Sequence, residues 1–182
     1  MGWHVVADAD GVNHDLCRQD LDNSCAAASI AMCVRKVKNT LCSESNARDA
    51  IGKLDASIKN FRDGTAAYTW MEVGIQPHAW GAALSSLGCR NAKTREAANA
   101  AGLIALLRSC SKRKPGVAGA LWDGGGGHAI VCIGPDNAGN DMLFLDPGHT
   151  GVVSIPMANL PRYVAPYGGA GDLAEFVVLA DW

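Results

Sequence analysis

The sequence lacks the features that mark nucleic-acid-binding, membrane-spanning and disulfide-rich or zinc-binding proteins. Charge of one sign is not in excess, because 16 Lys and Arg stand against 18 Asp and Glu in 182 residues, a formal net charge of −2. A nucleic-acid-binding surface needs clustered Lys and Arg. The densest basic run, Lys112-Arg113-Lys114, follows a helical pattern, and we interpret it as a solvated helix end that complements the dipole. We expect no nucleic-acid partner.

Long apolar runs are also missing. No stretch approaches the roughly 20 residues that a membrane-spanning helix needs, so we expect no membrane span. Residues 1–6 lack the charged start and apolar stretch of a secretory signal, and Val6 breaks the myristoylation motif that Gly2 would begin. We therefore expect a cytoplasmic protein, or one that a specialised secretion system exports without a cleavable signal peptide.

Cysteine is plentiful, but its spacing excludes two common roles. The count of seven is odd, and no Cys-x-x-Cys pair occurs, so neither a disulfide framework nor a structural zinc site is expected. The cysteines are Cys17, Cys25, Cys33, Cys42, Cys89, Cys110 and Cys132. The simplest compartment is a reducing one, and we expect no metal and no cofactor.

What is present is enough apolar sequence for a core. With 48% apolar residues, the chain fits one compact domain over residues 1–182. Helical patterns come first. Asp22, Asn23 and Ser24 supply N-cap chemistry directly before residues 25–38, which carry three consecutive alanines and a basic last turn and form the clearest helical stretch. Further helices are predicted at 45–61, at 77–87 and after Thr94-Arg95-Glu96, with Ala98, Ala101, Ile104 and Leu107 on one face.

Strand patterns dominate after Pro115. Alternating or continuous apolar residues between Gly, Pro, Asn and Asp turns predict strands at 117–122, 128–133, 142–146, 151–155 and 176–180, with another at 3–6. We predict an α+β, papain-like layout. A helical lobe spans about 20–112, and an antiparallel sheet lobe spans about 115–182 plus the N-terminal strand. A groove would lie between the two lobes.

Cys25 is the first candidate for chemistry. A thiol attacks a carbonyl carbon efficiently only as the thiolate, and unpaired N–H groups at a helix N-terminus favour an anion. Cys25 falls in the first turn of the strongest predicted helix. Gln19 lies six residues upstream, in a segment predicted to be irregular. Its side-chain amide and the backbone N–H of Cys25 could form the pair of donors that an oxyanion needs.

His128 and Asp146 are the second candidate pair. His128 begins one predicted strand, Asp146 ends the next, and the residues between them are rich in turn formers. In a hairpin symmetric about Asn137, the two residues would be directly opposed, with Cβ atoms about 4.5–5.5 Å apart. Asp146 would then orient the imidazole toward Cys25. A one-residue bulge would spoil this register.

Other residues are weaker candidates. Neither Ser24 nor Ser29 sits in a Gly-x-Ser-x-Gly elbow, so both are poor nucleophiles. His78 and His149 are alternative bases, in a helix's first turn and in a turn after Asp146 respectively. The glycines at 124–127 would let a substrate backbone approach His128 or let the loop move. Three tryptophans could edge the groove, although core packing is the simpler interpretation of each: Trp70, Trp80 and Trp122.

These residues together resemble the papain-like superfamily of cysteine peptidases. Within it, the pattern is similar to bacterial peptidases that trim double-glycine leader peptides from bacteriocins. The similarity lies in Gln19, residues 24–32, the strand that begins with His128, and Asp146-Pro147; Ser24 and Ala26 stand where that family usually has Asp and Gly. The resemblance implies Cys25 as nucleophile, His128 as base, Asp146 as the residue that orients it, and Gln19 as oxyanion donor.

The leading interpretation is therefore a cysteine peptidase that acts on a peptide or protein substrate through an acyl-enzyme. The same site could serve a cell-wall amidase, a side-chain deamidase or an acyltransferase, since fold and catalytic residues do not fix the acyl substrate. A binding module that keeps the fold without catalysis is a third interpretation. Papain-like effectors that bacteria inject into other cells are similar in size and layout, so that role stays open.

Overall fold

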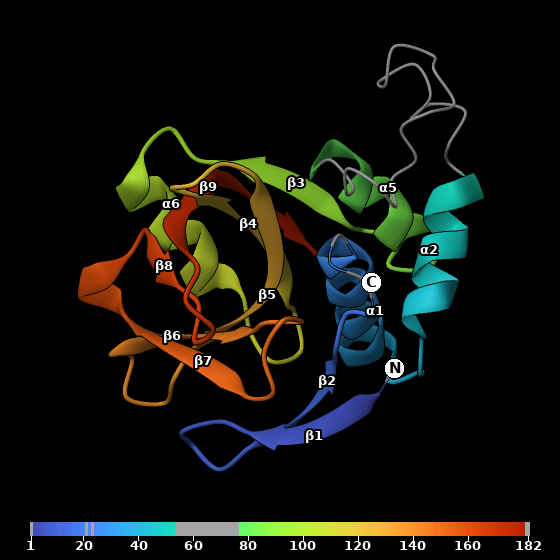
Figure 1. The fold of residues 1–182 in the computed structure, drawn as a ribbon, viewed down its shortest axis with the longest axis horizontal. Helices are drawn as coiled ribbons and strands as arrows, with labels where there is room; N and C mark the ends of the chain where they lie inside the picture. Colours follow the sequence, from blue (N-terminus) through green and yellow to red (C-terminus); the bar gives the residue numbers. More distant parts are fainter. Residues whose placement is uncertain (1, 21, 23, 54–76, 181–182) are drawn as a thin grey trace.

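The computed structural model describes residues 2–20, 22, 24–53 and 77–180, and it has an α+β architecture (Figure 1). Helices α1, α2 and α5 gather on one side, and a curled sheet lies on the other, with α1 between the sheet and α2. The helices are α1 (Cys25–Lys38), α2 (Glu44–Lys53), α5 (Pro77–Ser86) and α6 (Ala100–Ser109), with a 3₁₀ turn at Met157–Asn159. None of these helices is long and apolar enough to cross a membrane.

The strands form two antiparallel sheets. The small sheet pairs β1 with β2, and the large one has the order β3-β9-β4-β5-β6-β7, with β8 paired to β9. The strands are β1 (Trp3–Ala7), β2 (Asn13–Cys17), β3 (Lys93–Glu96), β4 (Gly116–Trp122), β5 (Gly127–Pro135), β6 (Asp141–Leu145), β7 (Val152–Pro156), β8 (Arg162–Val164) and β9 (Ala170–Leu179). Tight turns connect β4, β5, β6 and β7 in sequence, which confirms the predicted antiparallel sheet.

The centre of the large sheet is buried on both faces. Alternate residues of β5 point to opposite sides because a strand repeats every two residues. Ala129 and Val131 pack in the cluster that contains α1, whereas Ile130 and Cys132 pack in the cluster that contains α6. This two-sided burial explains why β5 reads as a continuous apolar run rather than an alternating one.

Helix α1 begins at the predicted residue. Its alanines are buried against the sheet, and it ends with Asn39 in the left-handed conformation at φ 53°. The expected N-cap chemistry was wrong in one respect. Ser24 occupies the N-cap position but makes no side-chain cap bond, because its hydroxyl is hydrogen-bonded to Glu44 at the start of α2. The described part of the second helix begins at Glu44, and positions 54–61 lie outside the described residues.

Three strands were not predicted. Residues 94–96 belong to β3, an exposed Lys-Thr-Arg-Glu strand that only its pairing with β9 defines, and not to a helix lead-in. Strand β2 carries no strand pattern, because three of its five residues are polar: Asn13, His14 and Asp15. Strand β8 has only three residues. In each case, long-range pairing overrides a weak local preference.

The basic run at 112–114 is also placed differently from the prediction. Lys112 is not simply solvated, because its Nζ lies 2.8 Å from Asp8 Oδ2 and 3.3 Å from Asp10 Oδ2. Asp10 Oδ2 also accepts a hydrogen bond from the backbone N–H of Asn137 at 3.0 Å. These contacts tie the turn of the β1–β2 hairpin to the body of the protein, and the chain runs from this hairpin directly into Gln19.

Candidate active site

Cys25 is the first residue of α1, and its side chain is only partly buried. The helix start is docked on the start of β5 by one buried hydrogen bond, from Ser29 Oγ to the carbonyl oxygen of Ala129 at 2.9 Å. Ser29 lies four residues after Cys25, on the same helix face, and Ala129 follows His128 directly. Together with the apolar packing of α1 on β5, this contact brings the thiol and the imidazole to the same place.

His128 and Asp146 are hydrogen-bonded, at 2.7 Å between Nε2 and Oδ1. The register that predicted this contact was wrong, because β5 and β6 pair Val131 with Leu145, two residues away from a hairpin symmetric about Asn137. Between Cys132 and Gly134 a bulge changes the register by one residue, so that Gly134 pairs with Leu143 on the turn side. A slip of two residues keeps both side chains on one face, and a diagonal pair stays within reach of a long side chain.

The Asp146 carboxylate is fully buried and surrounded by donors. Oδ1 accepts from His128 and from the backbone N–H of Gly148 at 2.7 Å, and Oδ2 accepts from the Tyr163 hydroxyl at 2.5 Å. Burial raises the pKa of Asp146, but the hydrogen bond and charge of His128, together with the other two donors, lower it below its usual value. The group is therefore held as a carboxylate.

Besides Asp146, three side chains contact the imidazole of His128. It is hydrogen-bonded to Cys25, and Trp122 stacks on its face with ring centroids 5.5 Å apart and planes at 22°. The Tyr167 hydroxyl lies 3.0 Å from Nε2. Since Nε2 faces Asp146 and Tyr167, Nδ1 is the atom left for the sulfur. Burial lowers the pKa of His128, but the hydrogen bonds to Asp146 and Cys25 and the charges of both groups raise it to about 9.

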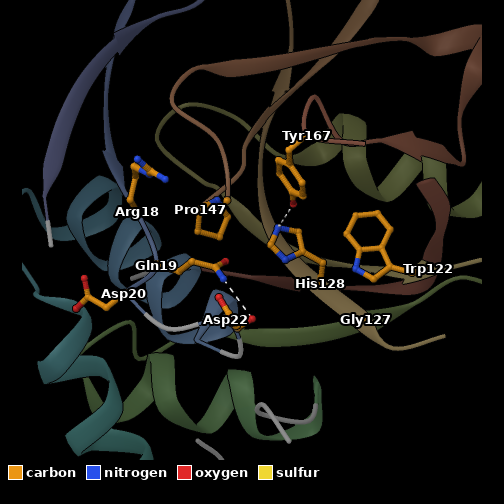
Figure 2. A pocket seen from close by; sticks show the side chains of 10 residues that line it. Arg18, Gln19, Asp20, Asp22, Trp122, Gly127, His128, Pro147 and Tyr167 are labelled. Atoms are coloured by element: carbon orange, nitrogen blue, oxygen red, sulfur yellow. Dashed lines mark hydrogen bonds between the residues drawn. The ribbon is translucent and has the colours of Figure 1, made fainter. Parts of the chain in front are cut away.

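Gln19 shares a pocket with His128 (Figure 2). Its side chain extends toward the imidazole, and Nε2 donates to the carbonyl oxygen of Asp22 at 3.3 Å. Its backbone N–H donates to the carbonyl oxygen of Pro147 at 3.0 Å, next to Asp146. The structure thus brings together all four residues that the sequence proposed for the site.

A buried carboxylate, Glu44, holds the segment between Gln19 and Cys25. Its Oε2 accepts from the backbone N–H of Asp20 at 2.7 Å, and it is hydrogen-bonded to the Ser24 hydroxyl. Arg48 lies one helical turn away, with Nη1 at 3.2 Å from Oε1. Burial raises the pKa of Glu44 despite these partners. One side chain of α2 therefore fixes both ends of the loop that leads to the nucleophile candidate.

The pocket between Gln19 and His128 has a volume of about 370 Å³. Trp122 and Tyr167 flank the imidazole, and Gly127 and Gly148 leave backbone exposed at its edge. The remaining lining residues are Arg18, Asp20, Asp22 and Pro147. Among the described residues, no group of three or more His, Cys, Asp or Glu side chains is arranged to hold a metal ion.

The weaker candidates take other places. The Ser24 and Ser29 hydroxyls are buried and bonded to Glu44 and Ala129. The ring of His149 lies against Gly151 within the same turn. Trp80 is buried against Phe176, as core packing predicted. Trp70 and the side chain of His78 lie outside the described residues.

Two residues that contact the pair were not identified from the sequence: Tyr163 on β8 and Tyr167 in the turn before β9. Trp122 was considered as a groove residue, but core packing was preferred. Trp122 packs against the buried cluster that contains α6 and also stacks on the imidazole of His128. Neither tyrosine carries a sequence signal for this contact, because they lie 17 and 21 residues after Asp146 and the β8–β9 pairing brings their segment to it.

Comparison with known proteins adds one structural similarity. No protein-family model matches the chain, and no curated protein matches its sequence. Among solved structures, the Pseudomonas avirulence protein AvrPphB is similar over 79% of this chain and 81% of its own, with a TM-score of 0.40 and 16% identity. At that level of similarity, the interpretation of the site rests on the contacts between its own residues.

Proposed function

We propose that this protein is a papain-like cysteine peptidase with Cys25 as its nucleophile. The observation that supports the proposal best is the position of one imidazole, which is hydrogen-bonded to the Cys25 side chain and, through Nε2, to the buried Asp146 carboxylate. A nucleophile, a base and a group that orients the base are the parts that covalent acyl transfer needs.

The proposed reaction begins with charge separation in the free enzyme. His128 carries a proton at neutral pH, since its pKa is about 9, and its positive charge adds to that of the α1 N-terminus beside the sulfur. The Cys25 thiolate attacks the carbonyl carbon of the scissile bond and forms a tetrahedral intermediate. The new oxyanion would accept hydrogen bonds from Gln19 Nε2 and from the backbone N–H of Cys25.

The second half of the reaction returns the enzyme to its starting state. His128 donates its proton to the leaving amine, the carbon–nitrogen bond breaks, and a thioester to Cys25 remains. His128, now neutral, takes a proton from water, and the hydroxide attacks the thioester carbon. Loss of the Cys25 sulfur releases the acid product and regenerates the ion pair. Asp146 keeps Nδ1 directed at the sulfur throughout these steps.

The substrate that we propose is a peptide or protein. The resemblance of residues 19–32 and 128–147 to double-glycine leader peptidases supports a bacterial peptidase, and a role as a secreted effector is part of the proposal. The site would act equally on other acyl groups, because nothing in the Cys25–His128–Asp146 arrangement selects the acyl group. The experiments below therefore also distinguish amidase, deamidase and acyltransferase activities from peptidase activity.

The experiment uses the six other cysteines as internal controls. Cys25 is the partly exposed one among seven, and the other six are buried, with burial raising the pKa of Cys89 to about 11 and of Cys17 to about 12. Iodoacetamide at neutral pH should alkylate Cys25 at least about tenfold faster than any other cysteine. His128→Ala should remove that advantage. Uniform labelling, or a Cys25 rate unaffected by His128→Ala, would contradict the proposed nucleophile and base.

Substrate assays then separate the reaction classes. Wild type and Cys25→Ala are incubated with unstructured peptides and, separately, with purified peptidoglycan. Peptide cleavage that Cys25→Ala abolishes supports the peptidase. Release of wall fragments with intact peptides would replace it with an amidase, and fast Cys25 labelling without either product would direct the search to deamidation or acyl transfer.

A further inference from the structure

The Asp146 carboxylate receives more hydrogen bonds than its contact with the imidazole requires. The hydroxyl of Tyr163, which lies on β8, donates a hydrogen bond to Oδ2 at 2.5 Å. The Tyr167 hydroxyl lies 3.2 Å from Oδ2, 3.4 Å from Oδ1 and 3.0 Å from His128 Nε2. Tyr163 lies on β8 and Tyr167 in the turn before β9, 17 and 21 residues after Asp146, so the chain brings a separate segment to this one carboxylate.

The two phenols occupy different surroundings. The Tyr163 side chain is fully buried, and its ring is fixed by Trp122 at 6.1 Å and Phe144 at 5.8 Å between centroids. Tyr167 is 50% exposed and meets the imidazole edge-on at 6.1 Å. Tyr163 therefore contacts the carboxylate from the core, and Tyr167 covers the His128–Asp146 contact on the solvent side.

Gly148 leaves the space that Tyr167 occupies. A Cβ at position 148 would lie 2.9 Å from both Cε1 and Oη of Tyr167, closer than real Cβ atoms approach. The same residue donates its backbone N–H to Asp146 Oδ1 at 2.7 Å. The turn after Asp146 is thus shaped to admit a phenol beside the carboxylate, and any side chain at Gly148 would displace it.

We propose that Tyr163 and Tyr167 are positioning residues whose hydroxyls fix the plane of the Asp146 carboxylate, so that Oδ1 stays aligned with Nε2 of His128. A carboxylate with a single partner rotates about its terminal torsion, because that torsion is broad. With Oδ2 tied to Tyr163, rotation would break a hydrogen bond to a charged group, and these are the stronger ones. The inference deepens the proposed function and rests on it.

The test removes one hydroxyl at a time and keeps each ring. Tyr163→Phe and Tyr167→Phe are compared with Ser154→Ala, which removes a hydroxyl that donates at 2.6 Å to another carboxylate of the sheet, Asp141. The first readout needs no substrate: solvent exchange of the His128 Nε2 proton, followed by NMR in protein labelled at histidine nitrogen. We expect exchange to be about tenfold faster in Tyr163→Phe, and faster in Tyr167→Phe, but unchanged in Ser154→Ala.

The second readout, the rate of Cys25 alkylation, tests whether both tyrosines act through Asp146. If each acts through the carboxylate, Tyr163→Phe and Tyr167→Phe should slow Cys25 alkylation in the wild-type background and cause no further loss in Asp146→Asn. Unchanged exchange and alkylation in both single variants, or losses that multiply with Asp146→Asn, would overturn the inference. Tyr167→Phe keeps the test open if Tyr163→Phe does not fold.

The outcome separates this inference from the proposed function. If Cys25 labelling depends on His128 and Asp146 but on neither tyrosine, the positioning role fails and the peptidase proposal survives. If Cys25 labelling is independent of His128 as well, the proposed function itself fails. In that case, faster proton exchange in the phenylalanine variants would still report a structural clamp on Asp146.

Discussion

Replacing Asp146 with Asn tests the electrostatic basis of the site. The substitution keeps the shape of the side chain but removes the charge that faces His128 Nε2 at 2.7 Å. The pKa of His128 is about 9 against an ordinary value of 6.5, and its side chain is only 8% exposed. A difference of about 2.5 pKa units corresponds to roughly 3 kcal/mol of preferential stabilisation of the imidazolium.

The sign of the effect on stability follows from the direction of the shift. Because folding raises the pKa of His128, its contribution is fully present below about pH 6.5 and is lost as the pH rises through about 9. In Asp146→Asn, burial remains while the largest opposing contact disappears, so the pKa of His128 should fall. Between about pH 6 and about pH 10, the unfolding free energy of wild type should therefore fall by up to about 3 kcal/mol more than that of Asp146→Asn.

The assay is urea unfolding across this range, with an NMR titration of His128 alongside. Other groups that titrate in the same range, such as Lys36, whose pKa burial lowers to about 8, are present in both proteins and cancel in the comparison. Asp141→Asn, next to the exposed Ser154 hydroxyl, is the matched control. Parallel stability profiles for wild type and Asp146→Asn would refute the argument that this carboxylate holds the imidazolium.

Three further substitutions probe the parts that surround the pair. Gln19→Ala should lower kcat by about 10²-fold while iodoacetamide still alkylates Cys25 at the wild-type rate; equal loss of both would contradict a role confined to the oxyanion. Glu44→Ala should reduce the unfolding free energy by about 3 kcal/mol, measured in urea, because it removes the acceptor of the Asp20 N–H and of the buried Ser24 hydroxyl. Gly134→Ala should cost more than Gly139→Ala in thermal unfolding. Both have positive φ, but a Cβ at 134 would overlap the carbonyl oxygen of Cys110, whereas position 139 is open.

The sequence was informative wherever local chemistry decides the structure. The start of α1 at Cys25 followed from capping residues and alanines, although Ser24 uses its hydroxyl on Glu44 instead of the helix. The contact between His128 and Asp146 followed from strand alternation, which tolerates an even slip in register. A slip of one residue would have turned Asp146 to the other face. The predicted contact therefore required only that the register shift be even, and not that the exact register be right.

The sequence was uninformative wherever distant segments meet. Tyr163 and Tyr167 reach Asp146 because β8 pairs with β9, and three residues of strand are too short to carry a pattern. Strand β3 has no apolar residue and exists through its partner alone. The bulge after Cys132 depends on Gly134, which has a positive φ and packs against a backbone carbonyl. Each of these features depends on a contact with a segment distant in the chain.

The buried polar residues show where this fold departs from the most stable arrangement. Among the described residues, six polar or charged side chains are buried, and four of them surround the site: Ser24, Ser29, Glu44 and Asp146. Burying such groups costs free energy even when each is hydrogen-bonded, and an apolar residue would pack in their place without that cost. Three of the four, Ser24, Ser29 and Glu44, are bonded to the backbone beside a proposed catalytic residue or to one another. Their shared effect is to fix Gln19, Cys25 and His128 relative to each other, which a preorganised site requires and a merely stable core does not.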